Sequence, residues 1–486
     1  MPILNGTERS TRRRANPRPR LLASAIVAAC SALISPLAIV STAHAGGTII
    51  VENCNNGGQG SLRQAIADSP DGGTVDLSQL QCSTITLASA LRIEQNALYM
   101  IGPGQDALAI DAGGGDRVVQ HTGTGPLTVQ YLTLLNGAYR GGPYGDPGGG
   151  CVLSHGSLHL SDATISGCTL TSEYSVTSGD VHLGGCVFTN GDISLLRSRV
   201  RDCTASLADD EELDGGGITS SGGHIGLIES SVTGVRTSSG YTFGVSVVGF
   251  HGLTMKYSTI DDNADVGDEA LGYASQGGGI QINGSVTINR STISNNRARS
   301  CGAGILSGGP VDIRNSTLAN NAGTLRTGGL CIINASEALV ANSTIAFNHA
   351  NPGFASGLYL YGSALELQST IIANNLAGTA ERDIGGDDMS STSGSHNLIP
   401  AFNIDVPADT LTADPELRAL HDNGGPTRTL ALNETSPAID AGDNPLELDS
   451  DQRGQEFMRE FGTSTDIGAF EHQPNADAIF WDGFEA

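Results

Sequence analysis

The chain has 486 residues, of which 66 are glycine and one is tryptophan; 16% are charged, and the formal net charge is −26. So much glycine, with no long stretch of helical periodicity, excludes a mainly helical protein. The excess of acidic residues excludes nucleic acid as a partner, because phosphate binding needs clustered lysine and arginine. It also argues against electrostatic attachment to anionic lipid.

Residues 1–45 have the features of a secretory signal peptide. Five arginines between residues 12 and 20 precede an apolar run from Leu21 to Val40, and Ala43-His44-Ala45 fits a small-residue cleavage site. We predict Sec export and cleavage after Ala45, which leaves no membrane span. The stretch ending at Cys30 resembles a lipoprotein box, but it lies inside the apolar run. The leader holds six arginines and one glutamate, so the remaining chain carries a formal charge of −31.

Eight cysteines remain after the leader, an even number that indicates disulfides in an exported chain. Cys54 and Cys82 share the N-terminal module, and we expect them to pair; Cys301 and Cys331 would complete the set. Four more lie at matching places in adjacent repeats, in two pairs separated by 17 residues: Cys151 and Cys168, Cys186 and Cys203. These four could be bridged within a repeat or between neighbouring repeats, or could be free thiols in a buried ladder.

Residues 46–111 form an N-terminal module with the first coils. Strands are expected at Thr48–Val51, Thr74–Leu77 and Ser83–Leu87, and a short amphipathic helix at Ser61–Ile66. The run Gly-Ser-Leu-Arg-Gln-Ala from Gly60, followed by Asp-Gly-Gly-Thr-Val-Asp-Leu, closely resembles the CSLREA domain of bacterial exported repeat proteins. That resemblance implies a cap rather than a catalyst, and an open end of stacked strands needs one.

Residues 112–382 carry a repeated unit, of which Gly277–Asn296 is the plainest copy. Val286 and Ile288 alternate with Thr287 and Asn289, the period of a strand. Equivalent apolar residues recur every 25 to 35 residues: Leu134, Ile165, Val200, Val232, Ile260, Ile293, Leu318, Ile345 and Ile371. A unit of this length with three short strands predicts one coil of a right-handed parallel β-helix of about ten coils. This all-β solenoid resembles the pectin-lyase-like superfamily.

The longer repeats contain insertions at one place, and we expect these loops to project from one flank. They span residues 138–147, 169–183, 204–214 and 263–276. Variable loops on a regular scaffold are where binding usually occurs. Two insertions are acidic: one has Asp209, Asp210, Glu211, Glu212 and Asp214, the other Asp261, Asp262, Asp265, Asp268 and Glu269. The first cluster, with Asp449 and Asp451 nearer the C-terminus, offers oxygen ligands for calcium, although neither has EF-hand spacing.

Lys256, Asp261 and Asp262 are the candidate catalytic residues. The fold that we predict hosts pectate lyases and polygalacturonases, but a fold alone does not assign an activity. Hydrolysis needs two carboxylates on opposite sides of the bond, and Asp261 and Asp262 are adjacent. Lys256, the only lysine in the chain, could act as the base of a lyase. It aligns with Asn289 and Arg314, which favours a solvated lysine at a bend.

Residues 383–472 depart from the repeat and resemble the choice-of-anchor Q domain that follows β-helices in exported bacterial proteins. The resemblance rests on four segments: 422–427 (DNGGPT), 436–442 (SPAIDAG), 451–454 (DQRG) and 466–471 (DIGAFE). Residues 473–486 end in IFWDGFE, which resembles a short tail of exported gammaproteobacterial proteins and is either a sorting signal or a docked strand. Together with the leader, these resemblances predict that the protein is located outside a Gram-negative bacterial cell.

Asn295, Asn320 and Asn374, with their neighbours, predict a ladder of stacked amides rather than a site. We therefore predict an exported, monomeric scaffold for adhesion or glycan binding through the loops on one flank. The alternative is a secreted polysaccharide lyase or glycoside hydrolase. The sequence implies no cofactor apart from calcium at the acidic residues.

Overall fold

The repeated unit at residues 277–296 begins one coil of the solenoid, and that coil has four strands. These are β30 (Ile280–Ile282), β31 (Ser285–Asn289), β32 (Thr292–Ser294) and β33 (Arg297–Ala298). The fourth, only two residues long, adds to the three that the sequence predicts. The computed structural model describes residues 46–141, 148–171, 181–207, 212–238, 241–242, 244–267 and 275–474, with the backbone alone at 181–183, 212 and 241.

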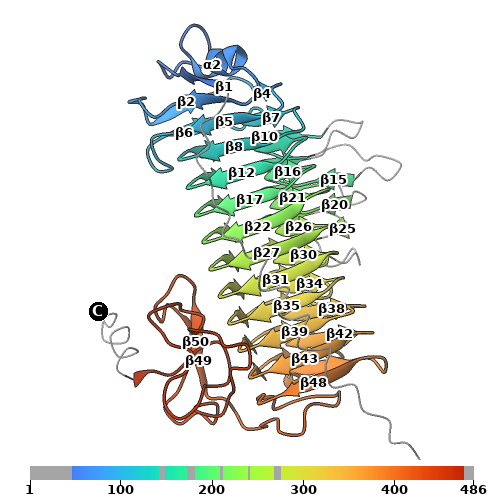
Figure 1. Ribbon diagram of the computed structural model, residues 1–486. Coiled ribbons are helices and arrows are strands. Elements are labelled where there is room, and N and C mark those ends of the chain that lie inside the picture. The colour runs from blue at the N-terminus through green and yellow to red at the C-terminus, as the bar shows by residue number, and fades with distance from the viewer. Residues whose placement is uncertain are drawn as a thin grey trace, which may run out of the picture. The chain divides into compact units, whose positions relative to one another are not determined.

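Equivalent strands of successive coils pair into sheets that run the length of the stack (Figure 1). Sheet A has thirteen strands: β1 (Gly46–Ile50), β2 (Gly73–Asp76), β5 (Leu98–Ile101), β8 (Leu127–Gln130), β12 (Leu158–Ser161), β17 (Ile193–Leu196), β22 (His224–Ile228), β27 (Gly252–Lys256), β31, β35 (Val311–Arg314), β39 (Ala338–Ala341), β43 (Ala364–Gln368) and β48 (Ser391–Ser395). Sheet B has eleven: β3 (Thr84–Thr86), β6 (Ala109–Asp111), β9 (Thr133–Leu135), β13 (Thr164–Ser166), β18 (Arg199–Arg201), β23 (Ser231–Thr233), β28 (Thr259–Asp261), β32, β36 (Thr317–Ala319), β40 (Thr344–Ala346) and β44 (Ile371–Ala373).

Two further sheets complete the coils, and a fifth lies beside them. Sheet C comprises β4 (Leu91–Ile93), β7 (Val119–His121), β11 (Val152–Ser154), β16 (Val187–Thr189), β21 (Ile218–Ser220), β26 (Val247–Gly249), β30, β34 (Ile305–Ser307), β38 (Leu330–Ile333), β42 (Leu358–Tyr361) and β47 (Ile384–Gly386). Sheet D comprises β10 (Ala138–Arg140), β14 (Thr169–Thr171), β19 (Thr204–Ser206), β24 (Arg236–Ser238), β29 (Ala264–Asp265), β33, β37 (Ala322–Gly323), β41 (His349–Ala350), β45 (Leu376–Ala377) and β46 (Ala380–Glu381). Sheet E comprises β15 (Val181–Leu183), β20 (Glu212–Asp214) and β25 (Tyr241–Thr242).

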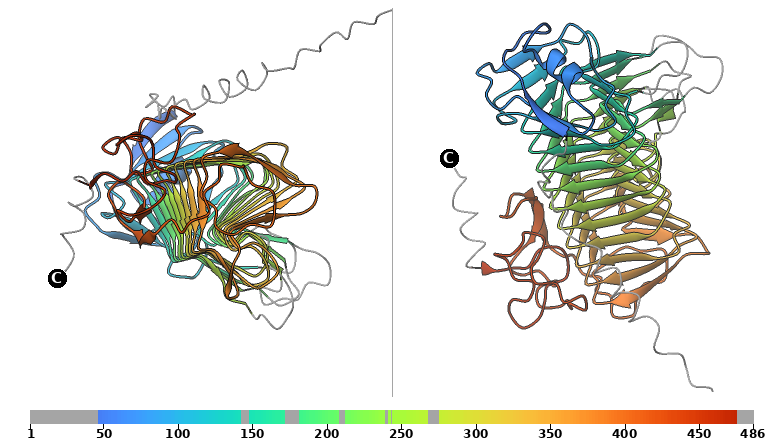
Figure 2. Two further views of the ribbon diagram at one scale, coloured as in Figure 1. Left: turned by 90° about the horizontal axis from the view of Figure 1, so that it is seen from below. Right: turned by 45° about the horizontal axis from the view of Figure 1, so that its top comes forward.

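The core lies inside the coils, where side chains of sheets A, B and C meet. In β31, Val286 and Ile288 point inward and are buried, whereas Thr287 and Asn289 point outward. Seen along the stack, the strands of each sheet overlie one another (Figure 2), so each inward residue packs on its equivalents in the coils on either side. Burying one such aliphatic side chain contributes roughly 1.5–3 kcal/mol. The predicted alternation and the predicted parallel solenoid are confirmed.

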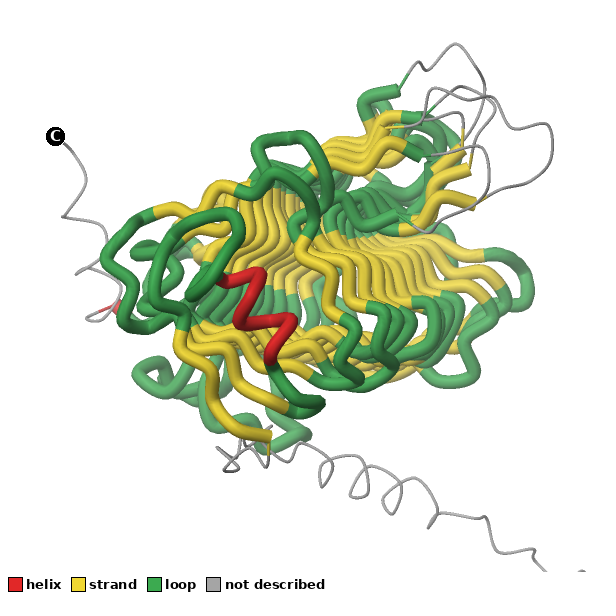
Figure 3. Tube along the Cα trace, turned by 90° about the horizontal axis from the view of Figure 1, so that it is seen from above, coloured by secondary structure: helices red, strands yellow, loops and turns green. Residues whose placement is uncertain are grey.

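Helix α2 (Leu62–Asp68) lies across the first coils (Figure 3). Its buried residues are Leu62, Ala65 and Ile66, the three that the sequence predicts. The Ser61 hydroxyl caps the helix by accepting from the backbone N–H of Gln64. Helix and coil are joined by Arg63, whose guanidinium donates to the carbonyls of Ser89 and Ala90 at 2.7 and 2.8 Å.

Two rows of left-handed residues form the turns that flank sheet B. The A–B turn row, between sheets A and B, is Tyr131, Asp162, Arg197, Glu229, Tyr257, Arg290, Asn315, Asn342, Ser369 and His396, with φ between 44° and 55°. The B–D turn row, after sheet B, includes Asn136, Asp202, Asp262, Asn295, Asn320, Phe347 and Asn374. Asparagine and aspartate tolerate this conformation best, which accounts for their frequency at these positions.

The predicted asparagine ladder lies one residue further along the chain than Asn295, Asn320 and Asn374. Those three occupy the B–D turn row, and the residues after them stack instead: Asn263, Asn296, Asn321, Asn348 and Asn375. Each buried amide donates to the next amide oxygen at 2.9 to 3.0 Å. Of the asparagines and neighbours that the sequence predicts to stack, the neighbours form the ladder, because the left-handed residue points outward and its successor inward.

The solenoid continues past residue 382, where the sequence analysis places the end of the repeats. β47 and β48 belong to sheets C and A, and Leu398 forms a parallel bridge with Ile371. After this last coil the chain turns back along the solenoid and forms the antiparallel hairpin β49 (Leu417–His421) and β50 (Thr429–Leu432). No helix of the described residues is long and apolar enough to cross a membrane.

Candidate functional site

The insertions leave successive coils from the same place. Their first residues belong to sheet D, in which Ala138, Thr169, Thr204, Arg236 and Ala264 are register partners. Three insertions then add the parallel strands of sheet E, including one from residues 236–245 that the sequence analysis did not single out. A small apolar cluster of Leu170, Ala205, Leu207 and Leu213 supports these strands.

The outer face of sheet C, next to the insertions, is covered. The residues at the middle of its strands point away from the core and are nonetheless buried: Leu153, Phe188, Thr219, Val248, Gln281, Leu306 and Cys331. Glycines with positive φ lie directly over them; a Cβ on Gly244 would lie 2.3 Å from Val248 Cγ2. This close approach explains the glycines that precede sheet C strands, and it leaves packed side chains, most of them apolar, instead of an open polar groove.

The second acidic cluster is neutralised by arginines. Asp262 pairs with Arg236 at 2.8 Å, and Asp265 forms a buried pair with Arg299 at 2.8 Å. Asp261 pairs with Arg428 at 2.8 Å and also accepts from the Ser294 hydroxyl and the Asn295 amide at 2.6 and 2.7 Å. The other two acidic residues of this cluster, Asp268 and Glu269, lie outside the described residues. Each described carboxylate of the cluster thus has a guanidinium partner.

Lys256 does not converge with Asp261. It is the last residue of β27, where Asn289 is its register partner, and Arg314 follows in the next coil. Its ammonium lies 5.5 Å from the centre of the Tyr257 ring. Asp261 ends β28, on the far side of sheet B from the A–B turn. The structure therefore does not bring the three candidate catalytic residues together around one point.

Arg428 belongs to a segment that packs on the outer face of sheet B, here called the docked module (residues 415–473). Apolar contacts join Leu430 to Ala319 and Ala346, and Ile467 and Phe470 to Ile371 and Ala373. Gln452 links the two parts by accepting from the Thr317 hydroxyl at 2.6 Å and donating to the Thr292 hydroxyl at 2.9 Å.

The A–B turn row also holds the docked module. Arg290 donates to the Ser450 hydroxyl and to the Asp451 carbonyl. The next three residues of the row bind backbone carbonyls: Asn315 that of Ser450 at 2.8 Å, Asn342 that of Asp443 at 3.1 Å, and Ser369 that of Asp443 at 2.7 Å. Four successive coils thus present one side chain each to the same segment.

Buried charges fill the interior of the docked module. Asp451 and Arg453 form a fully buried pair at 2.8 Å, and the Arg453 guanidinium lies between the rings of Phe457 and Phe470, 3.8 Å from each centre. Arg459 lies 3.5 Å from Glu471. Burial raises the pKa of Glu471 to about 8 against the pull of Arg459, and burial also raises the pKa of Asp451 and Asp466. The buried charges of the DQRG and DIGAFE segments therefore stabilise the fold of the module.

Among the described residues, the candidate calcium ligands Asp449 and Asp451 do not form a shared site. Both oxygens of Asp451 accept backbone N–H groups, from Arg453 and Glu471, and its ion pair is buried, whereas Asp449 is exposed. Asp209, Asp210 and Glu211 lie outside the described residues, the side chain of Glu212 is likewise not described, and Asp214 is half-buried. Within the described ranges, one group of potential metal ligands comes close together, Cys168, Cys186 and Cys203.

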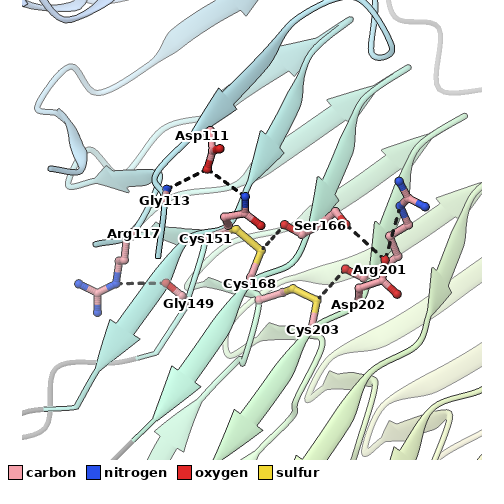
Figure 4. Close-up of a disulfide and its surroundings, with 12 residues drawn as sticks. Asp111, Gly113, Arg117, Gly149, Cys151, Ser166, Cys168, Arg201, Asp202 and Cys203 are labelled. Carbon is pink, nitrogen blue, oxygen red and sulfur yellow. Dashed lines mark hydrogen bonds and ion pairs between the residues drawn. A yellow bond between two sulfur atoms is a disulfide. The ribbon is translucent and has the colours of Figure 1, made fainter. Parts of the chain in front are cut away.

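Those cysteines are in disulfides. Cys151 pairs with Cys168 and Cys186 with Cys203, each within one coil, and the two bridges lie in adjacent coils (Figure 4). The pairs Cys54–Cys82 and Cys301–Cys331 are confirmed. The last one fastens the loop at Cys301 over the outer face of sheet C, where Cys331 and Leu306 pack. All eight cysteines of the described chain are bridged, so the free-thiol alternative is wrong.

Sequence reasoning missed the docking role of the A–B turn row. The signal was present: in most of these coils, the row residue immediately precedes a serine whose hydroxyl accepts from a backbone N–H of the preceding coil, as Ser316 after Asn315 and Ser343 after Asn342 do. It also missed Asp383, the buried carboxylate that ends the asparagine ladder by accepting from the Asn375 amide at 2.9 Å. Burial raises the pKa of Asp383 to about 7.

Comparison with known proteins supports the fold. The family model described as "Right handed beta helix region" matches residues 244–399, which include the plainest coils and the end of the solenoid. No curated protein and no solved structure matches the chain. The match and the stacked parallel sheets together identify the protein as a right-handed parallel β-helix.

Proposed function

We propose that this protein is an exported scaffold that contacts glycans or cell surfaces through one flank of its β-helix and does not cleave them. The observation that carries the proposal is the pairing of Asp261, Asp262 and Asp265 with three different arginines. These carboxylates are bound to guanidinium groups of the protein itself, so they do not form the two carboxylates on opposite sides of a bond that hydrolysis needs. The outer face of sheet C is covered by packed side chains, which also supports a scaffold rather than an enzyme with a substrate groove on that face.

The insertion flank is the binding surface in this proposal. Its strands leave each coil in register and stack into sheet E, so loops that are distant in sequence are carried side by side. The same proposal includes calcium binding by Asp209, Asp210, Glu212 and Asp214. The oxygen-rich composition of that loop supports it.

Export and display form the second part of the proposal. The leader at residues 1–45 would direct secretion, and four disulfides are typical of oxidising compartments. The resemblances to the CSLREA and choice-of-anchor Q domains support surface display, with residues 46–111 as the cap. In this proposal the tail at 473–486 is the sorting signal; beyond residue 474 it lies outside the described residues.

The alternative of a polysaccharide lyase or hydrolase is tested directly. The mature chain, residues 46–486, is incubated with acidic and neutral polysaccharides, with and without calcium, while unsaturated products and reducing ends are measured. The proposal expects no products, and it expects polysaccharide binding that is lost when residues 173–179 are deleted. Products that disappear in Asp261→Asn or Lys256→Ala would overturn it.

A further inference from the structure

The A–B turn row continues beyond the docked module, and there its side chains change. In the coils before Arg290 the row consists of Tyr131, Asp162, Arg197, Glu229 and Tyr257. The backbone N–H of each donates to the residue just before the next member, as Arg197 does to Ile228 at 3.0 Å. These five residues therefore follow one another along the stack at the coil spacing of about 4.8 Å.

Apart from Asp162, these residues are not the ones that the turn itself favours. All five have φ between 46° and 55°, where large side chains cost free energy relative to glycine or asparagine. In the covered coils the same position holds Arg290, Asn315, Asn342 and Ser369. A large side chain kept in an unfavourable conformation on the surface is a reason to look for a function there.

Three of the five form a charged group between two aromatic rings. Arg197 binds both oxygens of Asp162 at 2.8 Å, and Glu229 is exposed in the next coil, close enough to raise the pKa of Arg197 together with Asp162. Tyr131, 42% exposed, lies at one end of this set. Tyr257, which is half-buried next to Gly454 of the docked module, lies at the other. The rings are four coils apart, about 19 Å.

We infer that Tyr131, Asp162, Arg197, Glu229 and Tyr257 form a binding track for an extended, uncharged polysaccharide. Aromatic rings stack on the apolar faces of sugars, and planar carboxylate and guanidinium groups bind pairs of neighbouring hydroxyls. An extended glycan advances by about one coil spacing per sugar, so each of about five sugars would meet one row residue.

The charge of the track selects among partners. Asp162 and Glu229 outweigh Arg197, and the exported chain is strongly acidic, so a polyanion such as a polyuronate is repelled. The docked module is itself bound by the neighbouring members of the row, through polypeptide carbonyls and the small side chains of Asn315, Asn342 and Ser369. The track begins at Tyr257, whose ring lies next to Gly454 at the edge of the docked module.

The inference rests on the proposed glycan-binding function and deepens it, by adding a second binding surface on the A–B turn to the one on the insertion flank. The test is calorimetric titration of the mature chain with neutral hexasaccharides (cello-, malto- and laminari-hexaose) and with hexagalacturonate. The variants are Tyr131→Asn, Glu229→Asn, and Phe250→Ala, the last a control at an aromatic residue that is 40% exposed on another edge.

The expected result is binding of a neutral hexasaccharide that weakens about tenfold in Tyr131→Asn and Glu229→Asn, and is unchanged in Phe250→Ala. Because asparagine suits positive φ, Tyr131→Asn should also raise the melting temperature by roughly 1–2 °C, so that lost binding cannot be ascribed to unfolding.

Three results would overturn the inference. Neutral binding that survives Tyr131→Asn and is lost on deletion of residues 173–179 would refute the track and leave the proposed function standing. Binding of hexagalacturonate alone would refute the choice of an uncharged ligand. No binding of any hexasaccharide by the wild-type chain would refute both the track and the proposed function.

Discussion

The solenoid and the docked module are stabilised by opposite means. Inside the coils, stacked aliphatic side chains and neutral amide and hydroxyl ladders repeat from one coil to the next. Inside the docked module, carboxylates and guanidiniums are buried together, with Asp451 and Arg453 fully enclosed. A repeated coil can satisfy each polar group with its own copy in the next coil. A segment without repeats must supply a different partner for each group.

The largest effect is expected from unpairing the module's buried charges. Arg453→Met would leave Asp451 buried without its partner, which costs roughly 3–5 kcal/mol. Because the cost falls on the module, limited proteolysis should cut within residues 415–473 while the coils resist. Arg382→Met removes an exposed arginine and serves as the control. If the module of Arg453→Met stayed resistant to proteolysis, the buried ion pairs would not be what stabilises it.

The asparagine ladder gives the corresponding test in the solenoid. Asn321→Leu removes the acceptor for both the backbone and the side-chain amide of Asn296. Leaving such buried donors unpaired should cost about 3 kcal/mol and lower the melting temperature of the coils. Asn320→Gly, one residue earlier and at positive φ, should have little effect. Equal losses in the two variants would mean that the ladder is not the stabilising element.

A pH-dependent effect is expected where the ladder ends in a carboxylate. Burial raises the pKa of Asp383 from 3.8 to about 7, so its contribution to stability is fully present below pH 3.8 and is lost as the pH rises through 7. Asp383→Asn removes this titration. The free energy of unfolding of the variant relative to wild type should therefore increase by up to about 1.4 kcal/mol per pH unit between these values. If the free energy of unfolding depended on pH in the same way in both proteins, Asp383 would not be the group that titrates.

The smallest effect is expected at the interface between the two regions. Arg428 and Asp261 are partly exposed, so Arg428→Ala should weaken docking by about 1 kcal/mol or less, and less still at high salt. A double-mutant cycle with Asp261→Asn would measure the pair. A loss above 3 kcal/mol, or catalytic activity that changes with it, would show that Asp261 does more than hold the module.

Most of the solenoid was predictable from the sequence, because each coil repeats the same demands. Local sequence pattern predicts the alternation at Val286 and Ile288 and the helix at Leu62–Ile66. The even number of cysteines, with two of them in the N-terminal module, predicts the pairing of Cys54 with Cys82. The ladder was predicted for Asn295, Asn320, Asn374 and their neighbours together, because periodicity alone does not tell a left-handed turn residue from the inward residue after it.

The candidate sites were less predictable, because their partners lie far away in the chain. Asp261 meets Arg428, and Arg290 meets Ser450, across more than 150 residues. Nothing in the acidic run from Asp261 to Glu269 indicates that each described carboxylate has an arginine. The A–B turn row could have been aligned through the serines that follow it, but its contacts with the docked module depend on how that module folds.

The central claim is that the A–B turn row holds the docked module. Amide hydrogen exchange tests it most directly, in the wild-type chain and in a variant carrying Arg290→Ala, Asn315→Ala and Asn342→Ala together. We expect faster exchange of the amides at residues 443–454 in the variant, with unchanged exchange in β30, β34 and β38. Unchanged protection at residues 443–454 would contradict it.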